Sequence, residues 1–197
     1  MILGITGSFG SGKSTVARIF KSLSGTKAIL IDADLIARRV MAPGTKIYRR
    51  VIAIFGSDIL KKDGRIDRLR LARIVFEDKG LLKKLTEVVH PEVITVIKGK
   101  IKANTSRTVI LDAPLLIEAG LGKYLDKLCV VRIKRERQIQ RLIEKRGFAR
   151  SDILKRINSQ MPLGKKIRLA DFVIDNNGDI RKTKRQAAKI WRLLWKN

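Results

Sequence analysis

The stretch Gly7-Ser8-Phe9-Gly10-Ser11-Gly12-Lys13-Ser14-Thr15 decides the fold of this chain. It matches the spacing G-x-x-x-x-G-K-[S/T], follows the apolar run Ile2–Thr6 and precedes a segment with helical periodicity. Glycines let successive backbone N–H groups turn toward phosphate oxygens, because side chains would block that approach. A strand, a glycine-rich loop and a helix in this order predict a phosphate-binding loop.

The residues that end this motif each have a chemical role. Lys13 can reach the β- and γ-phosphates of a nucleotide, and the hydroxyl of Ser14 can ligate Mg²⁺. The helix that begins near Ser14 directs its positive end toward the same anion. The alternative is a turn that is merely rich in Gly and Ser. The position between a strand and a helix favours binding of a nucleoside triphosphate with Mg²⁺.

Five apolar runs predict the strands of a parallel sheet that is buried on both faces. They are Ile2–Thr6, Ala28–Asp32, Thr108–Asp112, Leu128–Ile133 and Phe172–Asp175. Helical spacing is found in Val16–Leu23, Leu69–Phe76, Leu81–Ile101 with a break at His90-Pro91, Asp152–Gln160 capped by Ser151, and Ile180–Trp195 with Ile190, Leu193 and Leu194 on one face. Alternating strands and helices predict a three-layer α/β domain over residues 1–197. A helical insert at about 45–105 is expected at the carboxyl edge of the sheet, where ligands bind.

The length and composition exclude several classes of protein. The chain has 197 residues, of which 45% are hydrophobic, so it suits one domain with a real core. No apolar run is long enough for a membrane span, and the N-terminus lacks the pattern of a signal peptide. Cys129 is the only cysteine, which excludes an intramolecular disulfide and, with a single histidine, the usual Cys/His zinc sites. A cytoplasmic location is expected.

The charge is extreme, with 44 basic and 18 acidic residues and a net charge of +26. Such a field attracts polyanions, and nucleic acids, nucleotides and anionic lipid headgroups are all candidates. Only 5% of residues are aromatic, and no stacking residues alternate with the basic run. A nucleic-acid partner is therefore not expected, and the simplest interpretation is a solvated, highly charged surface.

The motifs that other phosphate-loop proteins need are missing. A GTPase requires Asn-Lys-x-Asp to read guanine, and a transport ATPase requires Leu-Ser-Gly-Gly-Gln well after the loop; the sequence contains neither. The chain is also too short for a helicase or a motor. A small kinase, which must close over a second substrate, remains.

Carboxylates follow two of the predicted strands. Asp32 and Asp34 leave the second strand two positions apart, so they share a side if the strand geometry persists. Phosphoryl transfer to a hydroxyl needs a carboxylate to accept the proton, and we assign this role to Asp34; capping of the next helix is the alternative. Asp112 ends the third strand and is a candidate Mg²⁺ ligand or a turn-initiating residue before Pro114.

The basic segment from Lys134 to Arg156 has the character of a cationic lid. Arg141, Lys145 and Arg146 lie at helical spacing and could point at a bound triphosphate, although most charges in such a run are solvated. Trp191 and Trp195 are separated by four residues and are expected to pack a helix onto the core. Cys129 lies in an apolar strand and is expected to be a small buried hydrophobe.

With these residues together, the chain resembles the dephospho-CoA kinase family over almost its whole length. The resemblance is carried by the phosphate loop, Ile31–Arg38, Pro43-Gly44, Asp63-Gly64-Arg65-Ile66-Asp67-Arg68, Arg73–Phe76, His90-Pro91, Pro114-Leu115-Leu116-Ile117-Glu118, Ile157 with Ser159–Pro162, and Ala170–Gly178. The order of Asp-Ala-Asp, His-Pro, Pro-Leu-Leu-x-Glu and Ile-Asp-Asn-Asn-Gly is specific to that family. The resemblance implies a P-loop kinase fold with a five-stranded parallel sheet, a helical acceptor-binding insert and a helical lid at about 135–162.

The resemblance also implies an activity, which is transfer of the γ-phosphoryl group of ATP to the ribose 3′-hydroxyl of dephospho-CoA, the last step of coenzyme A synthesis. The residues carried over are Gly10, Ser11, Gly12, Lys13, Ser14 and Thr15 on the ATP phosphates, Asp34 as the general base, Asn176 and Asn177 against the adenine, and Arg38 and His90 at the acceptor site. Another small-molecule or nucleoside kinase is the alternative function.

One departure concerns the lid. Many members of the family carry Arg-Asp-Gly where this chain has Lys145-Arg146-Gly147. A lysine cannot make the bidentate contact of an arginine with a phosphate, so either Lys145 acts as a point charge or Arg146 replaces it from the next position. The cation that faces the phosphates is left open by the sequence, as is the oligomeric state.

Overall fold

A five-stranded parallel sheet forms the centre of the computed structural model, which describes residues 1–194. The strands are β1 (Ile2–Gly7), β2 (Ala28–Asp32), β3 (Thr108–Asp112), β4 (Lys127–Arg132) and β5 (Phe172–Asp175), in the spatial order β2-β3-β1-β4-β5. All four strand pairs are parallel. The five predicted strands and the α/β class are thereby confirmed.

The chain forms two compact units. The first comprises Met1–Asp32 and Ile101–Asn197, and the second comprises Ala33–Lys100. The helices of the first unit are α1 (Lys13–Ser24), α6 (Arg135–Arg146), α7 (Arg150–Asn158), α8 (Leu163–Arg168) and α9 (Ile180–Leu194), with short 3₁₀ turns at Gly25–Lys27 and Leu121–Tyr124. The second unit contains α2 (Ala33–Val40), α3 (Lys46–Phe55), a 3₁₀ turn at Ser57–Ile59, α4 (Arg68–Glu77) and most of α5 (Lys79–Lys102).

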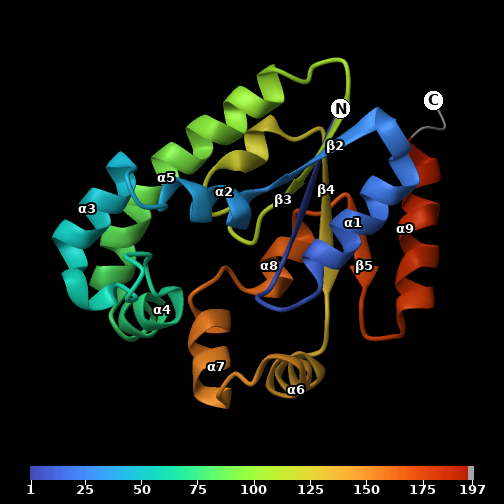
Figure 1. The fold of residues 1–197 in the computed structure, drawn as a ribbon. Helices are drawn as coiled ribbons and strands as arrows, with labels where there is room; N and C mark the ends of the chain where they lie inside the picture. The colour runs from blue at the N-terminus through green and yellow to red at the C-terminus, as the bar shows by residue number, and fades with distance from the viewer. Residues whose placement is uncertain (195–197) are drawn as a thin grey trace. The chain divides into compact units, whose positions relative to one another are not determined.

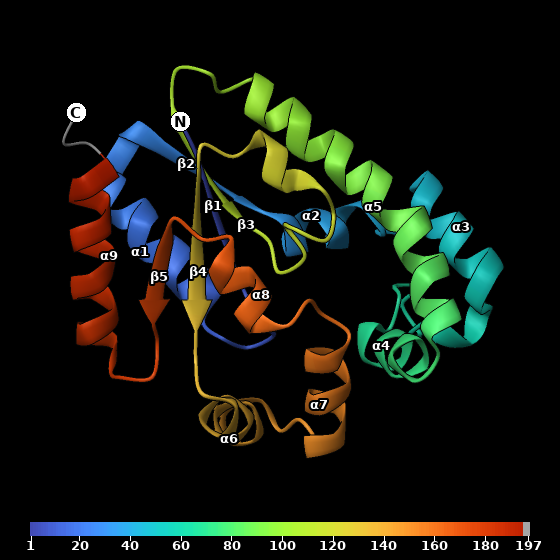
Figure 2. The same cartoon turned by 180° about the vertical axis from the view of Figure 1, so that it is seen from behind.

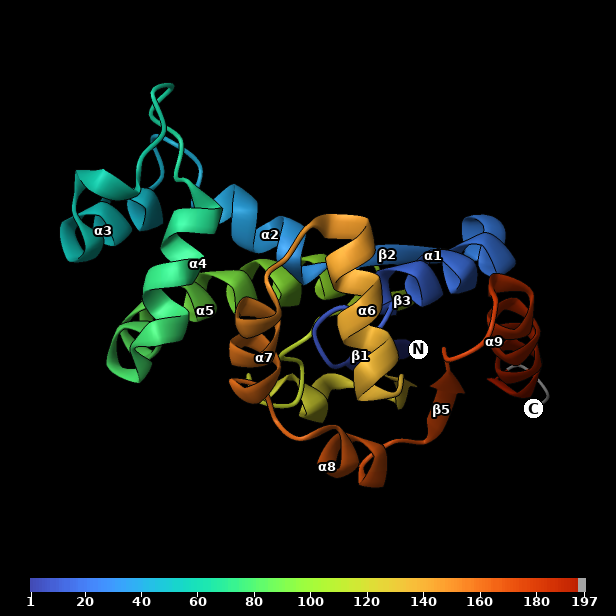
Figure 3. The ribbon, with the colours of Figure 1, turned by 90° about the horizontal axis from the view of Figure 1, so that it is seen from below.

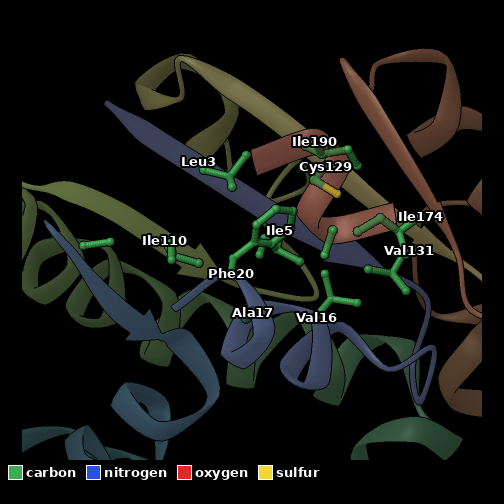
Figure 4. Packing of buried hydrophobic residues seen from close by; sticks show 12 residues of the cluster. Leu3, Ile5, Val16, Ala17, Phe20, Ile110, Cys129, Val131, Ile174 and Ile190 are labelled. Atoms are coloured by element: carbon green, nitrogen blue, oxygen red, sulfur yellow. The ribbon is translucent and has the colours of Figure 1, made fainter. Parts of the chain in front are cut away.

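The core of the first unit explains why these residues form a doubly covered sheet. Every residue of β3 is buried, as the apolar run predicts for a parallel strand with helices on both faces. Figure 1 shows α1 in front of the sheet, and Figure 2 shows α8 on the opposite side. Figure 4 shows Phe20 and Val16 of α1 packed among strand residues such as Ile5 and Ile110, all of them 0% exposed. Trp191 of α9 lies against Phe20, with ring centroids 6.2 Å apart.

Short local devices shape the second unit. The carboxylate of Asp67 accepts hydrogen bonds from the backbone N–H groups of Leu69 and Arg70, which caps the start of α4. Leu60 and Ile66 form an antiparallel bridge around Gly64, whose φ of 75° requires a residue without a Cβ. The carbonyl of Gly64 accepts the hydroxyl of Tyr48 on α3, which ties this turn to the helix.

Three helical expectations are wrong. α5 continues through Pro91 without a break, because buried valines on both sides, Val88 and Val93 among them, hold it against the second unit. α7 begins at Arg150 after Ala149, so Ser151 lies inside its first turn and is not the cap. On α9 the expectation is wrong only for Leu193, which is 51% exposed, because Ile190 is buried with Thr183 and Ala187 and Leu194 packs against the same core. Trp195 lies outside the described residues.

A buried lysine holds the loop that follows β3. Lys166 of α8 is 0% exposed, and its ammonium donates to the carbonyl of Pro114 at 2.7 Å and lies 2.8 Å from Oε1 of Glu118. The same carboxylate oxygen accepts the N–H of Met161, and the hydroxyl of Thr6 donates to the carbonyl of Pro114. The Pro-Leu-Leu-Ile-Glu segment is therefore fixed to both β1 and the chain that enters α8.

Replacing this lysine is expected to destabilise the protein. Lys166→Met keeps the length of the side chain but leaves the Glu118 carboxylate and the Pro114 carbonyl without a cationic donor. We expect a loss of about 2–3 kcal/mol in the free energy of unfolding measured with urea. Lys165→Met is the matched control, because Lys165 is exposed and its loss should change stability by less than about 0.5 kcal/mol. Equal effects of the two substitutions would contradict the role of Lys166.

Asp171 fastens the start of β5 to the start of β4. Its carboxylate accepts the N–H of Leu128 at 2.8 Å and the ammonium of Lys127 at 2.9 Å. Partial burial alone would raise its pKa, but these two donors outweigh burial and lower the pKa below its ordinary value of 3.8.

This carboxylate should make stability depend on acid pH. Because the folded pKa is lowered, its stabilising contribution is present above the unfolded pKa of about 3.9 and is lost as pH falls through the folded value. We expect Asp171→Asn to be less stable than the unchanged protein at pH 6, with a difference that shrinks as pH falls below about 4. Urea unfolding at a series of pH values measures this difference. A gap that stays constant down to pH 3 would remove Asp171 from the role.

Candidate active site

The phosphate loop joins β1 to α1, as the sequence predicts. Gly10 and Gly12 have φ angles of 73° and 95°, in the left-handed region that favours glycine. A Cβ on Gly10 would lie 2.7 Å from Leu142, and one on Gly12 would collide with the side-chain amide of Asn176. α1 begins at Lys13 directly after Gly12, so the helix N-terminus and the loop face the same space.

Lys13 and Ser11 lie inside this loop. The Lys13 side chain is 8% exposed, and its ammonium donates to the carbonyl of Ser8 at 3.3 Å, so it folds back over the start of the loop. The Oγ of Ser11 is buried without a hydrogen-bond partner among residues 1–194. A buried polar atom normally has a hydrogen-bond partner. An unsatisfied hydroxyl inside the loop therefore agrees with a loop that binds an anion.

Amide side chains from three distant segments hold the loop in shape. Gln138 of α6 donates to the Oγ of Ser8 at 2.7 Å and to the carbonyl of Phe9. Gln160, which follows α7, accepts the N–H of Phe9 at 2.8 Å. Asn176, which follows β5, donates to the carbonyl of Ser11 at 2.8 Å. Gln138 and Asn176 thus bind carbonyls of the loop, and Gln160 binds one of its N–H groups. Gln160 lies in the Ser159–Pro162 segment of the resemblance but was assigned no role, and Gln138 was not singled out.

Asn176 also connects the loop to a pocket beside α6. Its Oδ1 accepts the hydroxyl of Thr183, and its carbonyl accepts one N–H of Arg141 at 2.9 Å. A second N–H of Arg141 reaches the carbonyl of Gly178 at 3.1 Å. Partial burial and the neighbouring Arg137 lower the pKa of Arg141. Arg141 thus holds the loop after β5 through two hydrogen bonds.

The pocket itself has a volume of about 790 Å³, enough for a nucleoside. Its lining includes Thr15, Arg137, Lys145, Asn176 and Gly178. Asn177 is not part of this lining. Its side chain accepts the N–H of Lys134 and donates to Asp175, and these bonds shape the turn after β5.

The lid helices pack directly on the phosphate loop. Figure 3 shows α6 and α7 next to one another. Their shared apolar cluster consists of buried Ile139, Leu142 and Ile153, with Phe9, Phe148, Leu154 and Ile157 packed against it. Phe9 belongs to the phosphate loop itself, so the lid and the loop share one small core.

An arginine stacks on two of these rings. The guanidinium carbon of Arg156 lies 5.2 Å from the ring centroid of Phe9 and 4.8 Å from that of Phe148, and the rings meet edge to face at 5.7 Å. A cation–π contact of this kind contributes about 0.5–2 kcal/mol, depending on its exposure to water. Burial lowers the pKa of Arg156, and Asp152 acts in the opposite direction. Sequence reasoning placed Arg156 within a basic run but assigned it no role.

The carboxylates at the ends of the strands are arranged in register. Asp112 is 4% exposed and ends β3, and its Cα is paired with that of Asp32 on β2 and of Ile5 on β1. Asp34 is not on the strand, because α2 begins at Ala33. The expectation that Asp32 and Asp34 share one side of a continued strand is therefore wrong, and Asp34 is an exposed residue in the first turn of α2.

In the second unit, Asp34 and Arg38 both interact electrostatically with Arg68. Desolvation and the neighbouring Arg38 lower the pKa of Arg68, and Asp34 acts in the opposite direction. Arg68 is a member of this cluster that sequence reasoning did not single out, although it lies in the quoted Asp-Gly-Arg-Ile-Asp-Arg motif. His90 lies in the interior of α5, directly before Pro91.

Metal and membrane features are limited in the part of the chain that the structure covers. Residues 1–194 contain no group of three or more His, Cys, Asp or Glu side chains that could hold a metal ion. None of the helices in that range is both long and apolar enough to span a bilayer. Cys129 is buried in β4, as expected, and burial raises the pKa of its thiol to about 12.

Comparison with known proteins agrees with this arrangement of loop, sheet and lid. The family model described as dephospho-CoA kinase matches residues 1–182. A dephospho-CoA kinase of Carboxydothermus hydrogenoformans is 45% identical over 100% of this chain and 96% of the relative. The solved structure of TT1252 from Thermus thermophilus is 32% identical and has a TM-score of 0.81, with 100% and 98% of the two chains covered.

A dephospho-CoA kinase structure from Campylobacter jejuni, at 22% identity and a TM-score of 0.65, shares the fold over 98% of this chain and 96% of its own. The match of the family model over most of the sequence, together with relatives that are covered over nearly their whole length, identifies the chain as a phosphotransferase of the P-loop type. The chain belongs to the dephospho-CoA kinase family.

Proposed function

We propose that this protein transfers the γ-phosphoryl group of ATP to the ribose 3′-hydroxyl of dephospho-CoA and so completes coenzyme A synthesis. The observation that carries the proposal is a phosphate loop held from outside by Gln138, Gln160 and Asn176, in a chain of this family. Substrates that are both small polyanions agree with the net charge of +26.

The ATP site is proposed to extend from the phosphate loop into the pocket beside α6. Backbone N–H groups of Gly10–Thr15 would hold the phosphates, with the Lys13 ammonium at the β- and γ-phosphates. The nucleoside would occupy the pocket that Asn176 and Gly178 line, and Arg141 would keep that wall in place through its two carbonyl contacts. Asn177 supports the same turn and is proposed to act through it.

Mg²⁺ is proposed as the cofactor, and the donors fit it. The hydroxyl of Ser14 and the carboxylates of Asp112 and Asp32 are oxygen ligands of the kind that a hard cation prefers. Mg²⁺ in such sites uses one or two carboxylates and the phosphates of the substrate, and Asp112 and Asp32 are two carboxylates paired in register at neighbouring strand ends. When bound, the ion supplies charge neutralisation on the transferred group.

Asp34 is proposed as the general base. It follows the end of β2 by two residues, and it interacts electrostatically with Arg68 of the same unit. A charged carboxylate can orient the 3′-hydroxyl and accept its proton as the phosphoryl group is transferred. Arg38 and His90 are proposed to contact the acceptor from the same unit, and a cytoplasmic location is proposed for the protein.

The activity is tested with purified protein, ATP, Mg²⁺ and dephospho-CoA. We expect release of ADP that requires dephospho-CoA and gives a product 3′-phosphorylated on the ribose, as mass and regiochemistry would show. Chelation of the divalent ion should stop the reaction, and its restoration should recover it. ADP release that needs no dephospho-CoA, or that follows another nucleoside or small metabolite, would point to the alternative kinase.

The role of Asp34 is tested by Asp34→Asn. We expect turnover to fall by about 10²–10⁴-fold while ATP binding is retained, because the substitution removes the proton acceptor and keeps the size of the side chain. Asp58→Asn is the control, since Asp58 is an exposed carboxylate in the same unit and its replacement should leave turnover within about twofold. Near-normal turnover in Asp34→Asn would exclude Asp34 as the base.

A further inference from the structure

The nucleotide site has two distinguishable ends. The pocket beside α6 includes Thr15, Asn176 and Gly178, so it lies at the end of the loop that enters α1. The ammonium of Lys13, which marks the β- and γ-phosphates in such loops, is hydrogen bonded to the carbonyl of Ser8 at the other end. The γ-phosphate is therefore expected near Ser8 and Phe9, and the nucleoside near Asn176.

The basic residues of the lid divide between these two ends. Arg141 donates to the carbonyls of Asn176 and Gly178, and Lys145 lines the pocket at the nucleoside end. Arg146 is exposed at the end of α6. Arg156 is half-buried and stacks on the ring of Phe9, which places it at the γ-phosphate end.

We propose that Arg156 is the lid cation that contacts the γ-phosphoryl group, and that Phe9 and Phe148 hold its guanidinium in place. The proposal rests on the proposed use of ATP at this loop and goes beyond it by assigning the catalytic arginine. It also accounts for the lysine at position 145, because the bidentate donor is supplied from α7 and not from the end of α6.

The geometry of stacking agrees with this role. The guanidinium carbon of Arg156 lies 5.2 Å and 4.8 Å from the centroids of the two rings, and aromatic contacts of a guanidinium leave its N–H donors able to bind other groups. A stacked arginine can therefore donate two parallel hydrogen bonds to phosphate oxygens. Burial also removes competing water, which strengthens the attraction between this cation and the negative charge that develops on the transferred group.

Contacts between the lid helices and the phosphate loop fix the position of Arg156. Gln160, four residues after Arg156, accepts the N–H of Phe9, and Leu142 packs where a Cβ on Gly10 would lie. Arg156 and Gln160 thus both contact Phe9, and Leu142 packs at the next residue of the loop, Gly10. A displacement of α7 would move the arginine away from the phosphates together with these contacts.

The decisive variant is Arg156→Gln, with two readouts. The first is kcat with saturating substrates, which should fall by about 10²–10³-fold, as for the loss of one donor to a transition-state oxyanion. The second is binding by calorimetry of ADP and of the β,γ-imido analogue of ATP, which do not need the acceptor. Affinity for the analogue should fall at least tenfold more than affinity for ADP.

Companion variants separate catalysis from packing. Arg156→Lys keeps the charge without the planar fork and should recover part of kcat. Phe9→Leu keeps the apolar contact but removes a ring from the stack, so kcat should fall about three- to tenfold with ADP affinity unchanged. Arg150→Gln is the matched control, because Arg150 is an exposed cation on the same helix, and its values should stay within twofold.

The outcomes are distinguishable. Equal losses of ADP and analogue affinity in Arg156→Gln, with kcat within about twofold, would mean that Arg156 only packs the lid and would overturn the proposal. If Arg156→Gln fails to fold, Arg156→Lys and Phe9→Leu still carry the test, and unchanged kcat in both would overturn it. A protein that shows no turnover with dephospho-CoA would refute the proposed function, whereas the ratio of the two affinities would still decide the role of Arg156.

Discussion

The structure depends on the phosphate loop between β1 and α1, which must turn its backbone N–H groups toward an anion. These N–H groups therefore cannot all be paired within a strand or a helix. Such a segment keeps its shape only if other groups hold its carbonyls and if its turns carry no side chains. Gly10 and Gly12 satisfy the second condition with positive φ angles, and Gln138 and Asn176 satisfy the first by donating to the carbonyls of Phe9 and Ser11. Gln160 adds a third contact by accepting the N–H of Phe9. Those bonds also determine where α6, the chain after α7 and the turn after β5 lie in the first unit.

The same constraint joins recognition of the nucleotide to the lid. Phe9 is a loop residue and a member of the lid core, so the lid is attached to the phosphate end of the site through packing as well as hydrogen bonds. Arg141 fixes the nucleoside end by binding two carbonyls, and Arg156 stands at the other end on two aromatic rings. A preorganised arrangement of this kind lowers the reorganisation needed when charge develops on the transferred group.

The local pattern of residues predicted the strands well and some helix details poorly. β2, β3 and β5 have the expected bounds, because short apolar runs rich in β-branched residues favour strands, at the edges of the sheet as well as in the fully buried β3. The continuous α5 was not predicted, because packing around Val88 and Val93 outweighs the hydrogen bond that Pro91 cannot make. The direct passage from β2 into α2 was also not predicted, because neither Asp32 nor Ala33 is a residue that marks the end of a strand and the start of a helix. Asp34 consequently lies on a helix.

By itself, the sequence determined the phosphate loop, the parallel sheet and the roles expected of Lys13, Ser14 and Asp112, because these follow from motifs of adjacent residues and from apolar runs. The tertiary structure alone decided which distant side chains support them. Gln138 reaches Ser8 across 130 residues, Gln160 reaches Phe9 across 151, and Lys166 reaches Pro114 across 52. The position of Arg156 was decided in the same way. The residues next to such a polar side chain in the sequence do not indicate its partner, because its hydrogen bond forms only after the sheet and the lid helices have packed.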